Sequence, residues 1–369
     1  MKRKSRSQQE AEFYLGRARH ENSLQRKGKK YNPDKKIKSH NFFGYRYIVA
    51  PRNISIYSFS EGRDHYTDTV KFIEEIEKNF RRRKCIIDFR NTERVFAAAM
   101  VVVYAAFDNA RINGDQNSIV FWSPIKSVND SIKRNNLDLL IRNKNFVYRF
   151  ESKEFLPIVA SCSSLYREEI IDHIQKKVYG DQMSPETEHL YGDAVSETIN
   201  NVNLHAYPNL EDDQKKKWWL MCHVYGKELY LAIYDSGVGI PKTVWEKPWL
   251  VASLKRIYPN HYDALIKMYP DLEKNSMIPF IFVPNVNDPI LIHLAMQGDV
   301  SGTKKSKHGQ GSKSIKKMVS ETTQGKLWVF SNNGVYIFEN ETDEPVTFEL
   351  SKRLPGTLVQ WNIKLYENF

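Results

Sequence analysis

Thirteen consecutive apolar residues, VFAAAMVVVYAAF at positions 95–107, must leave water when this chain folds. A helix that crosses a bilayer needs about 20 such residues, so this run is too short to span a membrane. A helix that is apolar on every side is typical of a protein core, because each of its faces has to be covered. The run therefore predicts a buried helix, in a chain whose 369 residues are enough for two domains.

The positive charge of the chain is concentrated at its beginning. Residues 1–40 hold 13 Lys and Arg against 4 Asp and Glu, a net charge of +9 out of +11 for the whole chain. Such a segment is either a solvated, partly helical arm or a surface that contacts nucleic acid or an acidic protein. No aromatic stacking pattern or base-reading motif supports the second alternative. We expect residues 1–43 to form a basic N-terminal arm.

The cysteines and the N-terminus indicate a cytoplasmic location. Cys85, Cys162 and Cys222 are far apart and form no C-x-x-C pair, which argues against a disulfide scaffold and against a zinc knuckle. The charged N-terminus is not followed by an apolar stretch, so we expect no secretory signal and no membrane attachment.

Strand-like and helix-like segments alternate in the first half of the chain. The segments 84–89 (KCIIDF) and 118–122 (SIVFW) predict strands, whereas 66–83, 93–107 and 127–142 predict helices. This order is typical of an α/β domain whose sheet is covered by helices.

The pattern changes after residue 160. Residues 167–178 and 184–207 predict two helices, the second with Ser184 as its N-cap and Pro185 in its first turn. Two strand-like runs, KKWWLMCHVYG and KELYLAIYD, follow and meet at Gly226–Lys227, which predicts a hairpin.

The helix before this hairpin carries Glu197, Asn201 and His205 at a spacing of four residues. Side chains four apart lie on one face of a helix. These three side chains form either an exposed polar stripe or part of a site for phosphate and Mg²⁺. The second alternative is chemically reasonable because Mg²⁺ takes oxygen ligands and a nearby carboxylate can accept a proton.

Three glycine-containing segments follow in order. The hexapeptide DSGVGI, residues 235–240, stands at the end of a predicted strand. HGQGSKSIKKMV, from residue 308, places two glycines before a predicted helix, where backbone N–H groups and the helix dipole favour an anion. Gly356–Thr357 opens the last predicted strand. Each of these segments is weak evidence by itself, because turns and basic loops look similar.

Taken in order, E-x-x-x-N-x-x-x-H-A-Y, D-S-G-V-G-I, G-Q-G before a helix and G-T into a strand resemble the motifs of the GHKL ATPase superfamily. That superfamily includes gyrase, sensor histidine kinases, heat-shock chaperones, mismatch-repair ATPases and anti-sigma serine kinases, and the H-A-Y ending is closest to the anti-sigma branch. The resemblance implies a Bergerat-type α/β two-layer sandwich over residues 160–369 that binds ATP and Mg²⁺.

The resemblance also implies a role for each motif residue. Asp235 would accept a hydrogen bond from the adenine amino group, and Thr357 would support the same end of the nucleotide. Asn201 would hold Mg²⁺ against the phosphates, and Glu197 would be the catalytic base. The remaining nucleotide-binding residues that the resemblance implies are His205, Gly237, Gly239, Ile240, Lys307, Gly309, Gln310 and Gly311.

Two features depart from the family pattern. Ser312 stands where the family commonly has Leu after the second glycine, which puts a packing contact in doubt but not the phosphate cradle. The segment between the second and third motifs, residues 241–310, is long and contains helix-like pieces. Since the ATP lid of the family lies here, we expect an elaborated lid, and such lids gate the chemistry.

The first half of the chain resembles a STAS-type α/β domain, expected at residues 44–150, through its IIDF strand and the helix that follows. This is a likeness of pattern. In that family the loop after the strand often carries a phosphorylated hydroxyl, and Thr92 is the hydroxyl at this place. A domain that serves only for packing is the simpler interpretation.

Three activities remain open at this point. The first is an ATPase that acts as a conformational switch, through dimerisation or release of a protein partner. The second is a serine/threonine kinase of the anti-sigma type acting on a STAS-like domain, and the third is a nucleotide-binding scaffold without turnover. A sensor histidine kinase is disfavoured, because the surroundings of His173 do not resemble the usual H-E/D-x-x-x-P box.

Overall fold

The computed structural model describes residues 14–17, 41–42, 45–57, 64–111, 118–148, 150, 155–270, 286–297, 311–322, 324–342 and 344–365. The protein is 46% helical and 26% strand, so helices and sheets contribute together, which confirms the expected α/β class. Within the described ranges, no helix is both long and apolar enough to cross a membrane. Most of the predicted basic arm, residues 1–43, lies outside them.

A four-stranded sheet in the order β1-β2-β4-β6 organises residues 41–121, and its strands β2, β4 and β6 run parallel. Parallel neighbours need crossover connections, which α2 and α3 supply. We call residues 41–141 the N-terminal unit. Its strands are β1 (Asn41–Phe42), β2 (Tyr45–Val49), β3 (Asn53–Ile54), β4 (Cys85–Asp88), β5 (Arg94–Val95) and β6 (Ile119–Phe121). Its helices are α2 (His65–Asn79), α3 (Ala97–Ala110), α4 (Lys126–Arg134) and α5 (Leu137–Ile141).

The predicted helix 127–142 is wrong in one respect, because the structure divides it into α4 and α5. Asn136, between the two helices, has a φ of 58°, in the left-handed region that an α-helix cannot continue through. The predicted helix 93–107 is wrong at its start, because Arg94–Val95 form strand β5 against β3 and Phe96 is extended, so that α3 begins at Ala97. The predicted helix 66–83 corresponds to α2, which ends at Asn79, and the two predicted strands correspond to β4 and β6.

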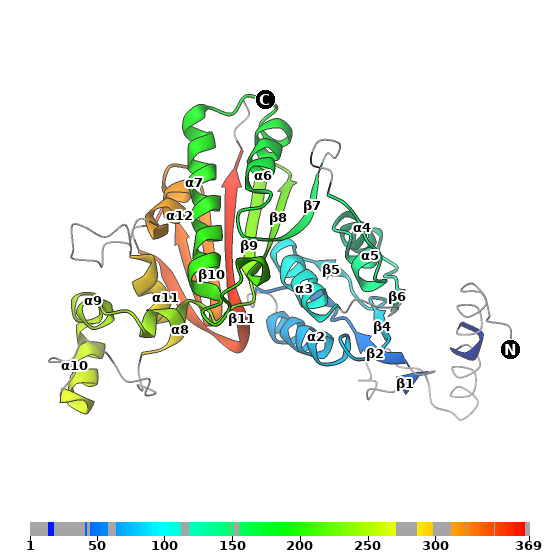
Figure 1. The fold of residues 1–369 in the computed structure, drawn as a ribbon, viewed down its shortest axis with the longest axis horizontal. Coiled ribbons are helices and arrows are strands. Elements are labelled where there is room, and N and C mark those ends of the chain that lie inside the picture. Colours follow the sequence, from blue (N-terminus) through cyan, green and yellow to red (C-terminus); the bar gives the residue numbers. More distant parts are fainter. Residues whose placement is uncertain are drawn as a thin grey trace.

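Helix α3 is buried on all sides, as its sequence predicts. Val101, Val102 and Val103 are each at most 1% exposed, although successive residues of an α-helix point about 100° apart. One hydrophobic cluster joins α3 to residues of a second sheet, including Trp219 and Tyr234. The helix therefore lies between two sheets (Figure 1), which is how each of its faces is covered.

The second sheet is antiparallel and has the order β10-β11-β9-β8-β7. Its strands are β7 (Leu156–Cys162), β8 (Lys217–Tyr225), β9 (Glu228–Asp235), β10 (Lys326–Glu339) and β11 (Val346–Lys364). Gly226, with a φ of 62°, forms the tight turn between β8 and β9, so the predicted hairpin is confirmed.

Strand β10 turns back on itself. Its two ends lie together, since Lys326 Nζ is 3.0 Å from Glu339 Oε1. Asn332 marks the reversal with a φ of 52°, and the register with β11 shifts on both sides of it. The turn at Asn332 stands at the same end of the sheet as the end of β9, because Ser331, Thr357 and Asp235 are paired in register.

Helices cover both faces of the five-stranded sheet. Leu231 and Ile233 of β9 pack against α6, α7 and α12, while the alternate residues Ala232 and Tyr234 pack against the N-terminal unit. Figure 1 shows α7 and α12 along one face and α2 and α3 beside the other. The helices of the first layer are α6 (Arg167–His173), α7 (Pro185–Asn201) and α12 (Gly311–Ser320).

Two of these helices end in a π-helical turn. The turn η1 (Ile174–Val178) follows α6, and η2 (Val202–Ala206) follows α7. A further short turn, η3 (Asp213–Lys215), precedes β8. Ser184 caps α7 by accepting a hydrogen bond from the N–H of Thr187, as the sequence predicts.

The segment between β9 and α12 builds its own small core from α8 (Ile240–Trp245), α9 (Leu250–Ile257), α10 (Pro259–Met268) and α11 (Asp288–Met296). Leu254, Leu265 and Leu291 are at most 1% exposed within it. Helix α11 also packs on the turn of β10, where a Cβ added to Gly334 would lie 2.8 Å from the nitrogen of Pro289.

Candidate functional site

A row of polar side chains crosses one end of the five-stranded sheet. Ser331 of β10, Thr357 of β11 and Asp235 of β9 are directly opposite one another, and Asp235 is also paired with Trp218 of β8. Paired residues point to the same face of a sheet. Trp218 packs in the cluster that contains α7, so the whole row faces the layer of α7 and α12.

Asp235 is the buried acidic group of this row. It is 5% exposed, and its Oδ1 accepts a hydrogen bond of 2.8 Å from the N–H of Gly237. Burial raises the pKa of Asp235 to about 7, although hydrogen bonds from the backbone N–H groups of Gly237 and Thr357 oppose this change. The carboxylate is therefore an acceptor whose charge changes near neutral pH.

The loop after Asp235 approaches its neighbours so closely that it needs glycine. A Cβ added to Gly237 would lie 2.2 Å from the carbonyl oxygen of Ala206, the last residue of η2. Gly239 has a φ of 86°, and a Cβ there would lie 2.5 Å from Nδ2 of Asn332. Both glycines are thus required by the backbone path.

Hydrogen bonds tie this loop to two other segments. The N–H of Val238 donates to the carbonyl of Ala206 at 2.8 Å, and Asn332 Nδ2 donates to the carbonyl of Val238 at 3.0 Å. The N–H of Ile240, the first residue of α8, donates to Ser331 Oγ at 2.9 Å. The end of α7 with its π turn, the glycine loop and the turn of β10 therefore meet at one place.

Glu197, Asn201 and His205 are half-buried along the helix that reaches this place. In a regular α-helix, residues eight apart are offset by roughly 80° around the axis. His205 lies in the π turn η2, where one turn takes more residues than in an α-helix. The four residues from Asn201 to His205 therefore advance less than a full turn, and the angle between Glu197 and His205 around the axis becomes smaller. The π turn therefore improves the alignment that the spacing predicts.

Glu197 has an environment suited to accepting a proton. Burial, and then the neighbouring charge of Asp193, raise the pKa of its carboxyl group above the ordinary value. Asn201 lies about 6 Å from Glu197 along the helix axis, between it and the glycine loop. The two side chains thus offer a carboxylate and an amide oxygen one turn apart.

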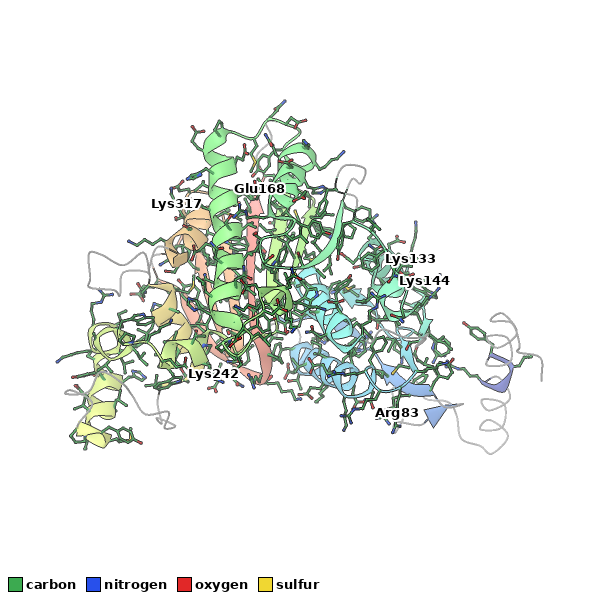
Figure 2. The ribbon with its side chains drawn as sticks, in the orientation of Figure 1. Arg83, Lys133, Lys144, Glu168, Lys242 and Lys317 are labelled. Carbon is green, nitrogen blue, oxygen red and sulfur yellow. The ribbon has the colours of Figure 1, made fainter. Side chains whose placement is uncertain are left out.

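Helix α12 brings the third motif to the same helix layer. Gly311 is its first residue, the helix packs against α7, and Trp361 Nε1 fixes it by donating to the carbonyl of Ile315 at 2.9 Å. In Figure 2, Lys317 of α12 lies beside α7, whereas Lys242 of α8 lies below the lower end of that helix. The other predicted residues of this motif, Lys307, Gly309 and Gln310, lie outside the described residues.

Two further residues that the sequence singles out are not accessible. Thr92 is 1% exposed, and its hydroxyl donates to the carbonyl of Pro51 at 2.9 Å. His173 is 4% exposed, and burial lowers its pKa. The three cysteines are free, as expected.

Sequence reasoning missed several residues of this place. Ser331 and Asn332 join it only through strand pairing, although the Asn332–Asn333–Gly334 sequence is typical of a tight hairpin turn. Asn109 of α3 joins it from the N-terminal unit by donating to Ser236 Oγ at 2.9 Å. No sequence signal connects Asn109 with the glycine loop.

No protein-family model matches this chain, and no curated protein shows significant similarity to it. The interpretation of the site therefore depends on its residues and their geometry.

Proposed function

We propose that this protein binds ATP with Mg²⁺ and hydrolyses it, as a regulatory or conformational switch of the histidine-kinase-like (GHKL) ATPase type. In this proposal the five-stranded sheet with α6, α7 and α12 is a Bergerat-type nucleotide-binding sandwich, and the N-terminal unit is a STAS-like domain. The observation that carries the proposal is the convergence of Asp235, Thr357 and the Gly237–Gly239 loop at the C-terminal end of α7.

The buried end of the site suits the base of the nucleotide. Asp235 directs a carboxylate into the helix-covered face of the sheet, next to the Thr357 hydroxyl, and both can hydrogen-bond to a purine. Gly237 has no side chain, which allows the loop after Asp235 to pass directly against the carbonyl of Ala206. An acidic acceptor beside the hydroxyls of Thr357 and Ser331, next to buried apolar side chains such as Trp218, is the arrangement expected of a specific small-molecule site.

The other end of the site suits the phosphates. Asn201 supplies an amide oxygen, the ligand type that Mg²⁺ accepts, and a single protein contact is sufficient because Mg²⁺ keeps several waters. When bound, Mg²⁺ would neutralise charge on the phosphates. The first turn of α12 at Gly311 would present backbone N–H groups to the same anion.

Glu197 would act on the attacking water. Its raised pKa makes it a better proton acceptor at neutral pH than an ordinary carboxylate. Its place one turn from Asn201 would align the water with the phosphate that Asn201 and the metal hold. Hydrolysis would then depend on positioning and charge neutralisation rather than on a covalent intermediate.

A serine/threonine kinase is the second candidate, because Glu197 could accept the proton of a hydroxyl as well as that of water. The α/β unit that packs directly on the nucleotide sheet is the observation in its favour. Thr92 is a poor acceptor for the phosphate, since its hydroxyl is buried and bonded to Pro51. A kinase of this kind would need another hydroxyl, on this chain or on a partner.

Incubation with γ-labelled ATP and Mg²⁺ tests the proposal. We expect wild-type protein to release the label as phosphate. Glu197→Gln should reduce this release at least about a hundredfold while leaving ATP affinity within about twofold, because a general base contributes 10²–10⁴ to rate and little to binding. Glu188→Gln is the matched control, since Glu188 lies on the same helix about 14 Å away along the axis.

The outcomes separate the candidates. Label that remains on the chain would identify a kinase, and ATP binding without either reaction would identify a scaffold. Equal phosphate release by Glu197→Gln and wild type would remove Glu197 from the mechanism.

A further inference from the structure

The C-terminal end of α3 reaches the glycine loop from the N-terminal unit. Asn109 Nδ2 donates to Ser236 Oγ at 2.9 Å. Its neighbour Asp108 accepts through Oδ2 from Lys217 Nζ at 3.0 Å and from Trp219 Nε1 at 3.2 Å, so it fixes the start of β8. Two consecutive residues of α3 thus hold two segments that flank Asp235.

Tyr207 completes a closed ring of hydrogen bonds with these residues. Its hydroxyl accepts from the N–H of Ser236 at 3.1 Å and donates to the carbonyl of Lys217 at 2.7 Å. Burial, and then the charge of Asp235, raise the pKa of Tyr207 to about 12, so the hydroxyl keeps its proton at neutral pH. The ring therefore passes from Ser236 through Tyr207 and Lys217 to Asp108, continues along the peptide chain to Asn109, and returns by a hydrogen bond to Ser236.

This ring leaves the loop little freedom to move independently of α3. On one side, Gly237 and Val238 are in contact with the backbone of Ala206. On the other side, Asn109 holds Ser236, and α3 itself is fixed between two sheets. A displacement of α3 would change the position of the loop, and a displacement of the loop would strain its bonds to α3.

We propose that Asn109 and Asp108 are positioning residues for the nucleotide base, through which the N-terminal unit sets the geometry of the Ser236–Gly239 loop beside Asp235. This inference rests on the proposed function. It gives the N-terminal unit a role in ATP affinity, without any contact between that unit and the reacting phosphate. Because Glu197 and Asn201 lie along α7, outside the ring, the effect should fall on binding and not on the chemical step.

The test is a double-mutant cycle of Asn109→Ala and Ser236→Ala. Each single variant should raise the Kd and the KM for ATP by about two- to tenfold, the equivalent of one hydrogen bond, with kcat unchanged. The double variant should be no weaker than Ser236→Ala, because Ser236→Ala already removes the bond to Asn109 together with the 3.3 Å contact between Ser236 Oγ and the Tyr207 hydroxyl. Asn109→Asp should restore affinity, since the Ser236 hydroxyl can donate to a carboxylate.

Asn340→Ala is the matched control. Asn340 also makes an exposed hydrogen bond, from its Nδ2 to the carbonyl of Thr322 at 3.2 Å, and it follows the end of β10 that is remote from Ser331. It should leave Kd and KM unchanged. Thermal unfolding of every variant checks that the fold is kept, and Ser236→Ala, which removes the same bond from the loop side, serves as the test variant if Asn109→Ala does not fold.

The outcomes distinguish this inference from the proposal on which it rests. ATP binding that is sensitive to Asp235→Asn but equal in Asn109→Ala and wild type would overturn the positioning role alone. Additive losses in the double variant, or a fall in kcat at constant KM, would do the same. Absence of ATP binding by the wild-type protein would overturn both.

Discussion

Replacing Asp235 with Asn should weaken nucleotide binding and stabilise the free protein at the same time. In the native structure Oδ1 of Asp235 accepts from the N–H of Gly237. An Asn side chain in the same place can direct only one oxygen at its partners. If this oxygen stays on the backbone donors, the NH₂ group faces the amino group of adenine, and two donors oppose each other.

The loss of affinity follows from the charge of the acceptor. A hydrogen bond to a charged group contributes about 1.5–3 kcal/mol, so ATP affinity at pH 8 should fall by about ten- to a hundredfold. ADP should lose the same factor, because both nucleotides carry the same base. Isothermal titration calorimetry with both ligands measures this, and equal ATP affinity in wild type and Asp235→Asn would refute the base assignment.

The gain in stability follows from burial. Asp235 titrates at about 7 in the folded protein against an ordinary value of 3.8, a gap that corresponds to about 4 kcal/mol. A raised pKa in the folded state means that its contribution to stability is complete below pH 3.8 and is lost as the pH rises through 7. Asn does not titrate, so the variant should gain over wild type from near zero at pH 4 to about 4 kcal/mol above pH 7.

Urea unfolding at several pH values measures this difference. Asp172→Asn is the control, because Asp172 is exposed on α6 and its ion pair with Lys176 spans 3.9 Å at the surface. That variant should show no comparable pH dependence. A pH-independent difference between Asp235→Asn and wild type would refute the argument from burial.

Three further variants test neighbouring parts of the site. Gly237→Ala should lower ATP affinity at least tenfold and stability by about 1–3 kcal/mol, because its Cβ would lie 2.2 Å from the oxygen of Ala206; affinity is measured by calorimetry and stability by urea unfolding. Gly192→Ala, in open space on α7, should instead raise stability by about 0.5–1 kcal/mol in the same unfolding assay, and a loss there would contradict the steric argument. Asn201→Ala should raise the Mg²⁺ concentration for half-maximal ATP turnover by about tenfold or more, and an unchanged Mg²⁺ titration would remove Asn201 as a ligand.

Local signals in the sequence were sufficient for much of the fold. The period and length of the apolar residues predict α2 and α3, and Ser184 with Pro185 marks the start of α7. The division between α4 and α5 was not predictable in this way. It depends on the left-handed conformation of Asn136, which many Asn residues do not adopt.

The site is predictable from the sequence only where its residues lie within one short segment. The spacing of Glu197 and Asn201 and the hexapeptide from Asp235 are visible in the sequence. Ser331 and Asn109 reach the same place through strand pairing and through the packing of α3 on the second sheet, which are long-range events without a local pattern. The π turn that carries His205 has no local sequence signal either, and its last residue, Ala206, accepts a long-range hydrogen bond from the N–H of Val238.

The apolar run at 95–107 also restricts how an ATPase of this kind could signal. A helix apolar on every face has to be covered on every face, and in this chain the second face of the five-stranded sheet covers one side of α3. That face is occupied by α2 and α3 of the same chain. A protein partner whose binding depended on the nucleotide would therefore have to bind elsewhere. The helices α8 to α11 are the alternative that the structure offers, since they have a core of their own and begin at Ile240, directly after the loop. Movement of the loop on nucleotide binding would therefore reach both the N-terminal unit, through Asn109, and these helices, through Ile240.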